Sequence, residues 1–326
     1  FALPGQGLAR GNDFRAGLHG TVFFFVGVEQ STPSSSEVAE DNDTINTLTD
    51  SPDKEHNIRP ALFGTLQYTF ANERSQLFFS KAELPTQTGS ALFSLGGKIK
   101  VGDASVVSLA YAPKLKGINS EAWEDPYLTG AKRQETDVEA QGGTLQVDQP
   151  FGVPAYVRFS YGEQTIEDEA SGRSLSAGSG SLNTEEINDL RRDGQFHKTT
   201  VGTMAPIGSS LYIAPSIHYI DGDTRGDAFT FSETGGEIGL IYGKEKRKAA
   251  LSVSYEAYDY KGAHPVFGKV RDDERITADF RFSHPTPFFW TETQTSYLVS
   301  FAKRKSNISF YESNEINLGV SLSYSF

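Results

Sequence analysis

The feature that most constrains the fold of this chain is an alternation of apolar and polar residues with a period of two. In the last segment, small polar residues and glycine separate the apolar residues Ile316, Leu318, Val320, Leu322, Tyr324 and Phe326. Successive side chains of a β-strand point to opposite faces, so this segment predicts a strand with one apolar face. The same pattern recurs at 62–70, 157–162, 251–256 and 276–283. The chain is therefore predicted to be all-β.

Alternating strands build either a soluble sandwich with an apolar core or a membrane barrel whose apolar face contacts lipid. The barrel is favoured because the polar faces carry charges together with many Gly and Ser residues, as a wet or tightly stacked lumen requires. The strands also run for about 10–14 residues, which is longer than the usual strand of a globular sheet and enough to cross a tilted bilayer. No apolar run reaches the length of a transmembrane helix.

We predict fourteen strands, at 14–30, 58–71, 75–83, 89–102, 105–114, 135–148, 154–167, 195–206, 209–221, 227–243, 247–260, 271–284, 292–305 and 313–326. Short turns alternate with long polar loops, of which the longest are 31–57, 115–134 and 168–194. An even strand number with both termini periplasmic is typical of barrels of the Gram-negative outer membrane. Twelve strands is the alternative, because 75–102 also fits an irregular stretch. A change of phase at Gly142 and Gly143 predicts a β-bulge.

Composition excludes several classes of function. The chain has 30 Lys and Arg against 42 Asp and Glu, a net charge of −12, whereas a nucleic-acid binder needs a basic surface. It has no Cys, which removes disulfides, thiol catalysis and thiolate metal sites. Because the sequence starts at Phe1 without a charged and apolar leader, we expect an exported protein whose signal peptide has been removed.

The two ends of the chain carry separate expectations. Tyr324 and Phe326 resemble the C-terminal signal that the barrel-assembly machinery reads in outer-membrane proteins. A periplasmic aromatic girdle is predicted from Phe288, Phe289, Trp290, Tyr324 and Phe326, because aromatic rings prefer the headgroup level. Residues 1–13 precede the barrel domain, 14–326, as a flexible periplasmic tail or as a small plug.

The loops hold much of the acidic charge. Segment 31–57 fits a solvated surface loop or, alternatively, a divalent-cation bridge to lipopolysaccharide. The residues Asp221, Asp223 and Asp227 faintly resemble a calcium loop, but a hairpin rich in Asp and Gly looks the same. We therefore assign no metal, and we expect no cofactor. Asn183 and Glu186 have capping-box spacing, which predicts a short helix at about 184–192.

Several blocks of sequence carry a resemblance to a known family. Residues 123–130 read Trp-Glu-Asp-Pro-Tyr-Leu-Thr-Gly, and further matching blocks lie at 47–53, 67–72, 133–137, 166–172, 193–198, 265–269 and 272–273. Together they resemble the gammaproteobacterial proteins catalogued as domain of unknown function 2860. The resemblance implies an outer-membrane protein and implies no established activity or ligand residue. The blocks fall at strand ends and loop bases, which suits loop docking or a ligand mouth.

The strand pattern also predicts which side chains face the lumen. The candidates for lining and selectivity are Lys98, Lys100, Arg158, Tyr212, His218, Glu256, Tyr258, Asp279 and Arg281. Charges of both signs either bias which solutes pass or pair with each other and fill the interior. Ser216 and His218 share this face, but no orienting acid or oxyanion hole accompanies them, so we do not expect an enzyme.

Three functions remain open from the sequence. The first is a porin-like channel for passive uptake of a small solute. The second is a transporter for hydrophobic solutes of the fatty-acid type, whose marks are an apolar lumen or a lateral gap in the wall. The third is a non-conducting surface barrel that binds a partner through acidic loops. We expect a monomer that contacts outer-membrane lipid, lipopolysaccharide, the barrel-assembly machinery and a small solute, and no nucleic acid.

Overall fold

The computed structural model describes residues 14–32, 39, 42–49, 54–87, 93–115, 120–176, 181–286 and 292–326. Its strands are β1 (Gly17–Ser31), β2 (Glu55–Thr69), β3 (Ser75–Lys81), β4 (Phe93–Val101), β5 (Ser105–Ala112), β6 (Ser120–Trp123), β7 (Glu135–Asp148), β8 (Ala155–Ile166), β9 (Gly194–Thr203), β10 (Ala205–Pro206), β11 (Leu211–Thr224), β12 (Phe231–Lys244), β13 (Arg247–His264), β14 (Lys269–Pro285), β15 (Thr293–Ser306) and β16 (Ser313–Ser325). The helical turns are η1 (Pro150–Gly152), η2 (Arg173–Leu175), α2 (Thr184–Asn188), η3 (Asp227–Phe229) and η4 (Ser309–Tyr311). None of the described helices is long and apolar enough to cross a membrane.

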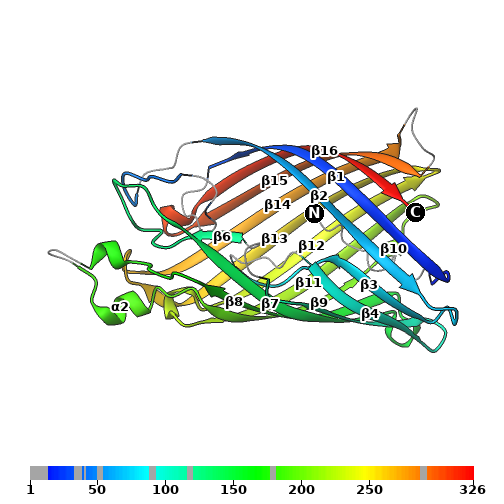
Figure 1. Ribbon diagram of the computed structural model, residues 1–326, viewed down its shortest axis with the longest axis horizontal. Coiled ribbons are helices and arrows are strands. Elements are labelled where there is room, and N and C mark those ends of the chain that lie inside the picture. The colour runs from blue at the N-terminus through cyan, green and yellow to red at the C-terminus, as the bar shows by residue number, and fades with distance from the viewer. Residues whose placement is uncertain are drawn as a thin grey trace.

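Fourteen of these strands close into one antiparallel barrel, which confirms the predicted fold class and strand number (Figure 1). The barrel closes where β1 pairs with both β2 and β16. β6 and β10 do not count as separate strands of the barrel. β6 continues β5 along β7, and β10 continues β9 along β11. Pro215, which has no N–H to donate, lies on β11 between the residues that pair with β9 and those that pair with β10.

The two rims of the barrel differ. Short connections such as 102–104 and 245–246 gather at one end, which also holds the C-terminus (Figure 1). The opposite end carries the longer connections, including 32–54, 113–134 and 167–193. We call them the short-turn rim and the long-loop rim. Both ends of the described barrel chain lie at the short-turn rim, because Gly17 pairs with Thr69 beside the β2–β3 turn and Phe326 exchanges hydrogen bonds with Gly20.

The outward face of the barrel is apolar and exposed. On β2, Leu62 is 73 % exposed and Ile58 is 74 % exposed, and Ile217 on β11 is 67 % exposed. A continuous surface of this kind is rare on a soluble monomer and is what lipid contact requires. The inward face alternates with it and carries small polar residues, among them Ser252, Ser296, Ser300 and Ser321. The period-two pattern of the sequence therefore reflects an exposed apolar outer face on one side of the wall and the interior on the other.

The predicted β-bulge at Gly142 and Gly143 is wrong. β7 keeps one continuous register with β5 and with β8 through both glycines. The phase of the sequence changes because the interior changes: near the long-loop rim, Val138 points inward and is fully buried with Ile166, whereas Leu145 points outward and is 40 % exposed. An inward apolar residue indicates that the barrel is filled at this level.

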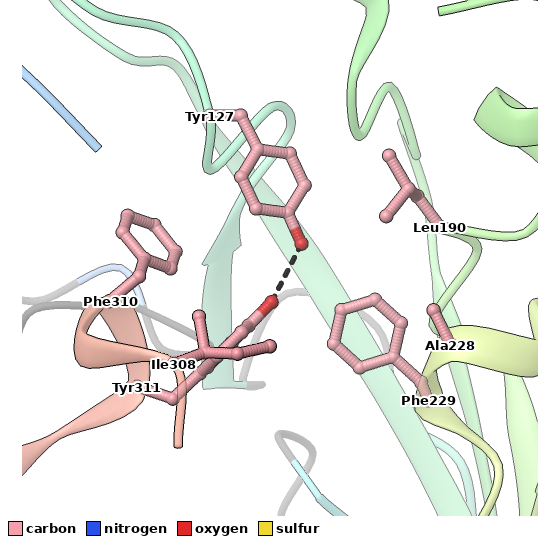
Figure 2. Packing of buried hydrophobic residues seen from close by; sticks show 7 residues of the cluster. All are labelled: Tyr127, Leu190, Ala228, Phe229, Ile308, Phe310 and Tyr311. Carbon is pink, nitrogen blue, oxygen red and sulfur yellow. Dashed lines mark hydrogen bonds between the residues drawn. The ribbon is translucent and has the colours of Figure 1, made fainter. Parts of the chain in front are cut away.

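The filling comes from the connections of the long-loop rim. We call the cap the segments 42–49, 120–134, 167–176, 181–193, 225–230, 264–268 and 307–312. Its core consists of Tyr127, Leu190, Ala228, Phe229, Ile308, Phe310 and Tyr311, which converge from four of these segments (Figure 2). Within the cap, α2 begins at the predicted capping box of Asn183 and Glu186 but ends at Asn188, before the predicted end. The long loops are therefore docked on one another.

Candidate functional site

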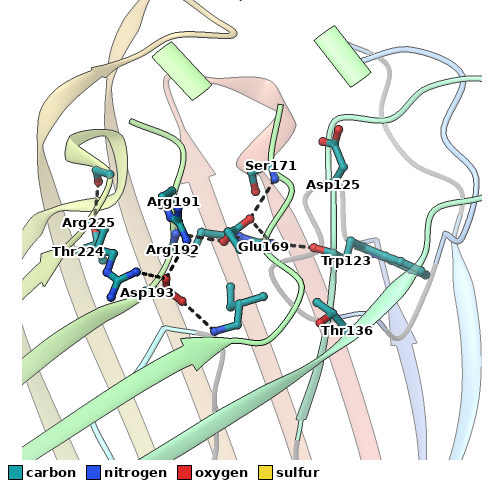
Figure 3. A network of polar contacts seen from close by, with 12 residues as sticks. Trp123, Asp125, Thr136, Glu169, Ser171, Arg191, Arg192, Asp193, Thr224 and Arg225 are labelled. Atoms are coloured by element: carbon teal, nitrogen blue, oxygen red, sulfur yellow. Dashed lines mark hydrogen bonds and ion pairs between the residues drawn. The ribbon is translucent and has the colours of Figure 1, made fainter. Parts of the chain in front are cut away.

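A buried ion pair joins the segments of the cap (Figure 3). Arg192 and Glu169 are 1 % and 3 % exposed, and the guanidinium donates from Nε to Oε2 and from Nη2 to Oε1, each at 3.0 Å. Arg192 also donates to the carbonyl of Trp123 at 2.7 Å. Burial alone raises the pKa of Glu169, but the charge and hydrogen bonds of Arg192 outweigh it, so that the pKa lies below its usual value. The pair is charged and holds the loops of the cap together.

Two further carboxylates of the cap accept backbone hydrogen bonds. Asp125 accepts from the N–H groups of Tyr127, Gly172 and Ser174 at 3.1, 3.0 and 2.8 Å. Asp193 accepts from Ile166 at 2.9 Å (Figure 3). These residues belong to the sequence blocks that carry the family resemblance. Their role in the structure is loop docking, one of the two roles that the sequence left open.

Two buried arginines stack on aromatic rings of the cap and its base. The guanidinium of Arg133 lies 4.5 Å from the Trp123 ring centre, and that of Arg271 lies 3.5 Å from the Tyr311 ring centre. Arg271 also forms a fully buried ion pair with Asp273, with Nη2 and Oδ2 2.6 Å apart. A cation desolvated against an aromatic face is a favourable contact, so these arginines stabilise the cap rather than offer charge to a solute.

His264 is the last residue of β13 and the first residue of cap segment 264–268. Its Nε2 is 2.9 Å from the hydroxyl of Tyr127 and 2.7 Å from that of Tyr311, and the two hydroxyls are 2.8 Å apart. Burial and the nearby charge of Arg271 lower the pKa of His264 to about 3, and burial raises the pKa of Tyr127. The imidazole is therefore neutral at physiological pH.

A segment between β3 and β4 folds into the barrel. Residues 82–87 leave the wall and cross to β7 and β8, where Leu84, Pro85 and Thr86 pack over Gly142 and Gly162. A Cβ on Gly162 would come within 3.0 Å of Thr86 and 3.1 Å of Pro85, so the two glycines leave room for the segment. At its end, Gln87 donates to the carbonyl of Phe229 at 3.3 Å, which ties the segment to the cap.

A cavity of about 270 Å³ lies beside this segment, against the inner walls of β2–β5, β7 and β8. Its charged lining is mixed: Lys98 and Arg158 face Glu83 and Asp148. Arg158 donates to Gln146 at 2.7 Å and lies 3.6 Å from Glu83, while Gln146 donates to Asp148 at 2.7 Å. The ammonium of Lys98 lies 5.2 Å from the Phe78 ring centre. A polar solute in the cavity would meet both signs of charge.

The wall beside this cavity is low. β3, β4 and β5 have 7, 9 and 8 residues, whereas β2 has 15 and β7 has 14 (Figure 1). β3 pairs with β2 only at Leu66–Thr69, so within the described chain residues 55–65 of β2 have no strand partner on the side away from β1. Next to this edge, Phe23 and Phe63 stack on the inward face with ring centres 5.1 Å apart, and Phe63 is 40 % exposed.

The register puts every predicted lumen residue on the inward face but spreads the set over several places. Lys98 and Arg158 line the cavity. His218, Glu256 and Tyr258 lie together on β11 and β13. The remaining candidates lie apart from both groups: Asp279 and Arg281 on β14, Tyr212 on β11, and Lys100 over the buried ring of Phe14.

The other residues predicted from the sequence lie in different places, and some lie outside the described residues. Phe288, Phe289, Trp290 and residues 1–13 lie outside the described residues. Tyr324 and Phe326 are exposed on the outer face at the short-turn rim and stack on each other, with ring centres 6.1 Å apart. On β11, Asp221 and Asp223 face outward and Asp221 pairs with Lys261 at 3.6 Å, while Asp227 begins η3.

Sequence reasoning missed four inward acids that accompany the predicted residues: Glu83, Asp148, Glu233 and Glu237. Glu83 lies in the inward segment, where no period exists to assign a face. β12 carries Thr234 and Gly236 on its outward side, so its alternation is weak and its two Glu residues could not be given a face. Only the pairing of β12 with β13, whose alternation is clearer, could have assigned these two Glu residues to the inward face.

Comparison with known proteins shows both a family and a fold. The model of a family described as "Protein of unknown function (DUF2860)" matches residues 17–325. No curated protein matches the sequence significantly. Similar solved structures include a FadL homologue of Pseudomonas aeruginosa, with TM-score 0.52 and 10 % identity over 94 % of this chain and 90 % of that one. The toluene transporter TbuX of Ralstonia pickettii has TM-score 0.48 and 10 % identity over 96 % and 90 %.

A third similar structure is OmpT, an outer membrane protein of Vibrio cholerae, with TM-score 0.46 and 13 % identity over 94 % of this chain and 98 % of that one. At such identities the FadL homologue shows the fold alone, which is that of Gram-negative outer-membrane barrels. What any of these proteins transports is not carried over to this chain.

Proposed function

The chain belongs to the DUF2860 family, whose description gives no activity, and from this premise we propose that it is an outer-membrane channel for passive uptake of a small polar solute. The observation that carries the proposal is the cavity of about 270 Å³ with Lys98, Arg158, Glu83 and Asp148 on its walls. Fixed charges of both signs in a confined aqueous space bind and orient small polar solutes. The chain performs no catalysis in this proposal.

The cap sets the route. Its core fills the centre of the long-loop rim, so a solute passes beside it, over the low wall of β3–β5 and along segment 82–87 into the cavity. In this proposal the short-turn rim faces the periplasm, residues 1–13 form a tail or plug there, and Tyr324 and Phe326 are read during assembly. The long-loop rim then contacts lipopolysaccharide, and the channel is a monomer.

The test is single-channel conductance of the refolded protein in a planar bilayer, with reversal potentials measured across a salt gradient. Discrete conductance steps with a measurable ion preference support the channel. A folded barrel that inserts but stays silent contradicts it. That result would favour a non-conducting surface barrel, provided that the second candidate below also fails.

A second candidate function is the uptake of hydrophobic solutes. The observation that favours it is the low wall beside the edge of β2 that has no strand partner among the described residues, where the stacked Phe23 and Phe63 face inward. An apolar solute could reach these rings from the side of the barrel. Binding of a fluorescent fatty-acid analogue tests it: Phe63→Ala should weaken binding about tenfold, whereas Phe24→Ala on the lipid face should not. Equal binding by both variants contradicts this function.

A further inference from the structure

The inward faces of β11, β12 and β13 bring an imidazole and two carboxylates together, away from the cavity. One donor atom each of His218, Glu233 and Glu256 lies within 4.8 Å of the other two. Nε2 of His218 is 2.6 Å from Oε1 of Glu233, and these side chains are 9 % and 5 % exposed. The three residues come from three neighbouring strands, so the barrel wall itself fixes their separation.

A glycine forms the floor of this cluster. Gly235 of β12 is paired with His218 on one side and with Glu256 on the other, so the three residues form one row across the wall. A Cβ on Gly235 would lie 2.4 Å from Cε1 and Nε2 of His218 and 3.2 Å from Cγ of Glu256. The absence of a side chain here is what lets the imidazole and the carboxylate close over the strand.

The surroundings hold one of the donors by a hydrogen bond and add a further acid to the same face. Tyr258 donates its hydroxyl to Oε2 of Glu256 at 3.1 Å, which fixes that carboxylate. Oε1 of Glu237, a further acid on the same face of β12, is buried and has no hydrogen-bond partner in the described part of the chain. Lys198 and Arg275 face the same space, but among the described residues neither forms an ion pair with Glu233 or Glu256.

We propose that His218, Glu233 and Glu256 bind one divalent transition-metal ion inside the barrel. Imidazole with carboxylates is a donor set for Zn²⁺ and its neighbours, whereas Ca²⁺ and Mg²⁺ prefer oxygen donors alone. Donors of a tetrahedral zinc ion lie about 3.3 Å apart, so the three donor atoms, which lie within 4.8 Å of one another, need to shift only slightly to enclose the ion. Tyr258 acts as the outer partner that orients a ligand.

Calorimetric titration of the full-length refolded barrel with ZnCl₂, after dialysis against EDTA, tests the site. We expect one equivalent of Zn²⁺ to bind. His218→Gln should weaken this binding by about 100-fold, and Gly235→Ala and Tyr258→Phe by about tenfold each. The matched control is His197→Gln, which removes an exposed imidazole from the outward face of the adjacent β9 and should leave binding unchanged.

A Co²⁺ complex gives a second readout, because its visible spectrum reports nitrogen ligation and changes when His218 is lost. Each variant is first checked for the faster gel migration of a folded, unheated barrel. Absence of Zn²⁺ binding, or binding that His218→Gln leaves intact, overturns the proposal. In the first case His218 and Glu233 are a structural hydrogen-bonded pair. Bilayer conductance is measured separately, so failure of the channel proposal does not decide this one.

Discussion

At the scale of single residues, we expect the charges in the cavity to set which ions the proposed channel prefers. The lining carries Lys81, Lys98 and Arg158 against Glu83 and Asp148, a formal charge of one positive unit. Lys98→Glu changes this balance by two units and should raise the cation-to-anion permeability ratio about tenfold, since fixed charge in a confined space concentrates counter-ions. The reversal potential in a salt gradient measures it.

Lys303→Glu is the matched control for this prediction. Lys303 is exposed and faces outward on β15, so its charge lies outside the lumen. An equal shift of the reversal potential in both variants would show that the charge acts over the whole surface and that the cavity does not lie on the ion path.

His264 gives the cap a pH dependence whose sign is fixed by burial. The pKa of His264 is about 3 in the closed cap and about 6.5 in an opened one. Between these two values His264 is protonated in the opened cap and neutral in the closed cap. The contribution of the neutral His264 to the stability of the closed cap is complete above pH 6.5 and is lost as the pH falls towards 3. At pH 5 the loss is about 2 kcal/mol. Fluorescence of the buried Trp123, in a Trp290→Phe background, measures cap opening.

His264→Phe is the control for the pH effect. Phenylalanine keeps a ring in the site and does not titrate, and the hydroxyls of Tyr127 and Tyr311 remain 2.8 Å apart. The variant should lose most of the change in cap opening between pH 6.5 and 5. If its pH profile matches that of the unaltered protein, another group controls the acid response.

At the scale of elements, the cap should loosen without unfolding the barrel. Glu169→Gln leaves Arg192 as a buried charge without its partner, which costs about 3–5 kcal/mol. We expect faster proteolysis within 167–193, while the unheated protein still migrates as a folded barrel. Glu167→Gln, at an exposed carboxylate two residues earlier, should change neither property. Loss of barrel migration in Glu169→Gln would mean that cap and wall fold as one unit.

How much of the elements the sequence could predict depended on what each strand faces. β16 has lipid on one side and small polar residues on the other, so its period predicted a strand correctly. β7 faces the cavity at Gln146 and the cap at Val138, and its inward pattern therefore changes from polar to apolar. From the alternation alone, this change of pattern in β7 was wrongly explained by a β-bulge. Segment 82–87 has no period, and its inward path rests on contacts with Gly142 and Gly162 that lie far away in the sequence.

At the scale of the whole molecule, the proposed channel gives the cap and the wall different tasks: the wall holds the charges and the cap limits access to them. A looser cap should therefore increase ion flow. We expect Glu169→Gln to raise single-channel conductance about twofold or more, and acidification to pH 5 to act in the same direction in the unaltered protein. Conductance that is unchanged in both experiments would show that ions do not pass near the cap.

The sequence could predict which side chains of the candidate sites point into the barrel, but not which of them lie together. Strand parity assigns Lys98, His218 and Glu256 to the interior. Only the register, which sets Gly235 between His218 and Glu256, shows that these two meet and that Lys98 belongs to another group. The cap residues Asp125 and Glu169 were visible in the sequence as family blocks, but their partners are backbone groups and charges of other loops.

The low wall of β3–β5 has a consequence for how copies of this protein meet. An unpaired strand edge is a template for a strand of another chain, and adhesive edges lead to aggregation. The hydrogen-bond ladder of β1 shows where the edge is weak. Gly20 bonds to Phe326, directly after β16, so by alternation the nitrogen of Pro60 points away from β1, toward the open edge. Proline has no hydrogen there to give. The open edge of β2 therefore lacks a hydrogen-bond donor in its middle, which opposes the pairing of strands between neighbouring barrels.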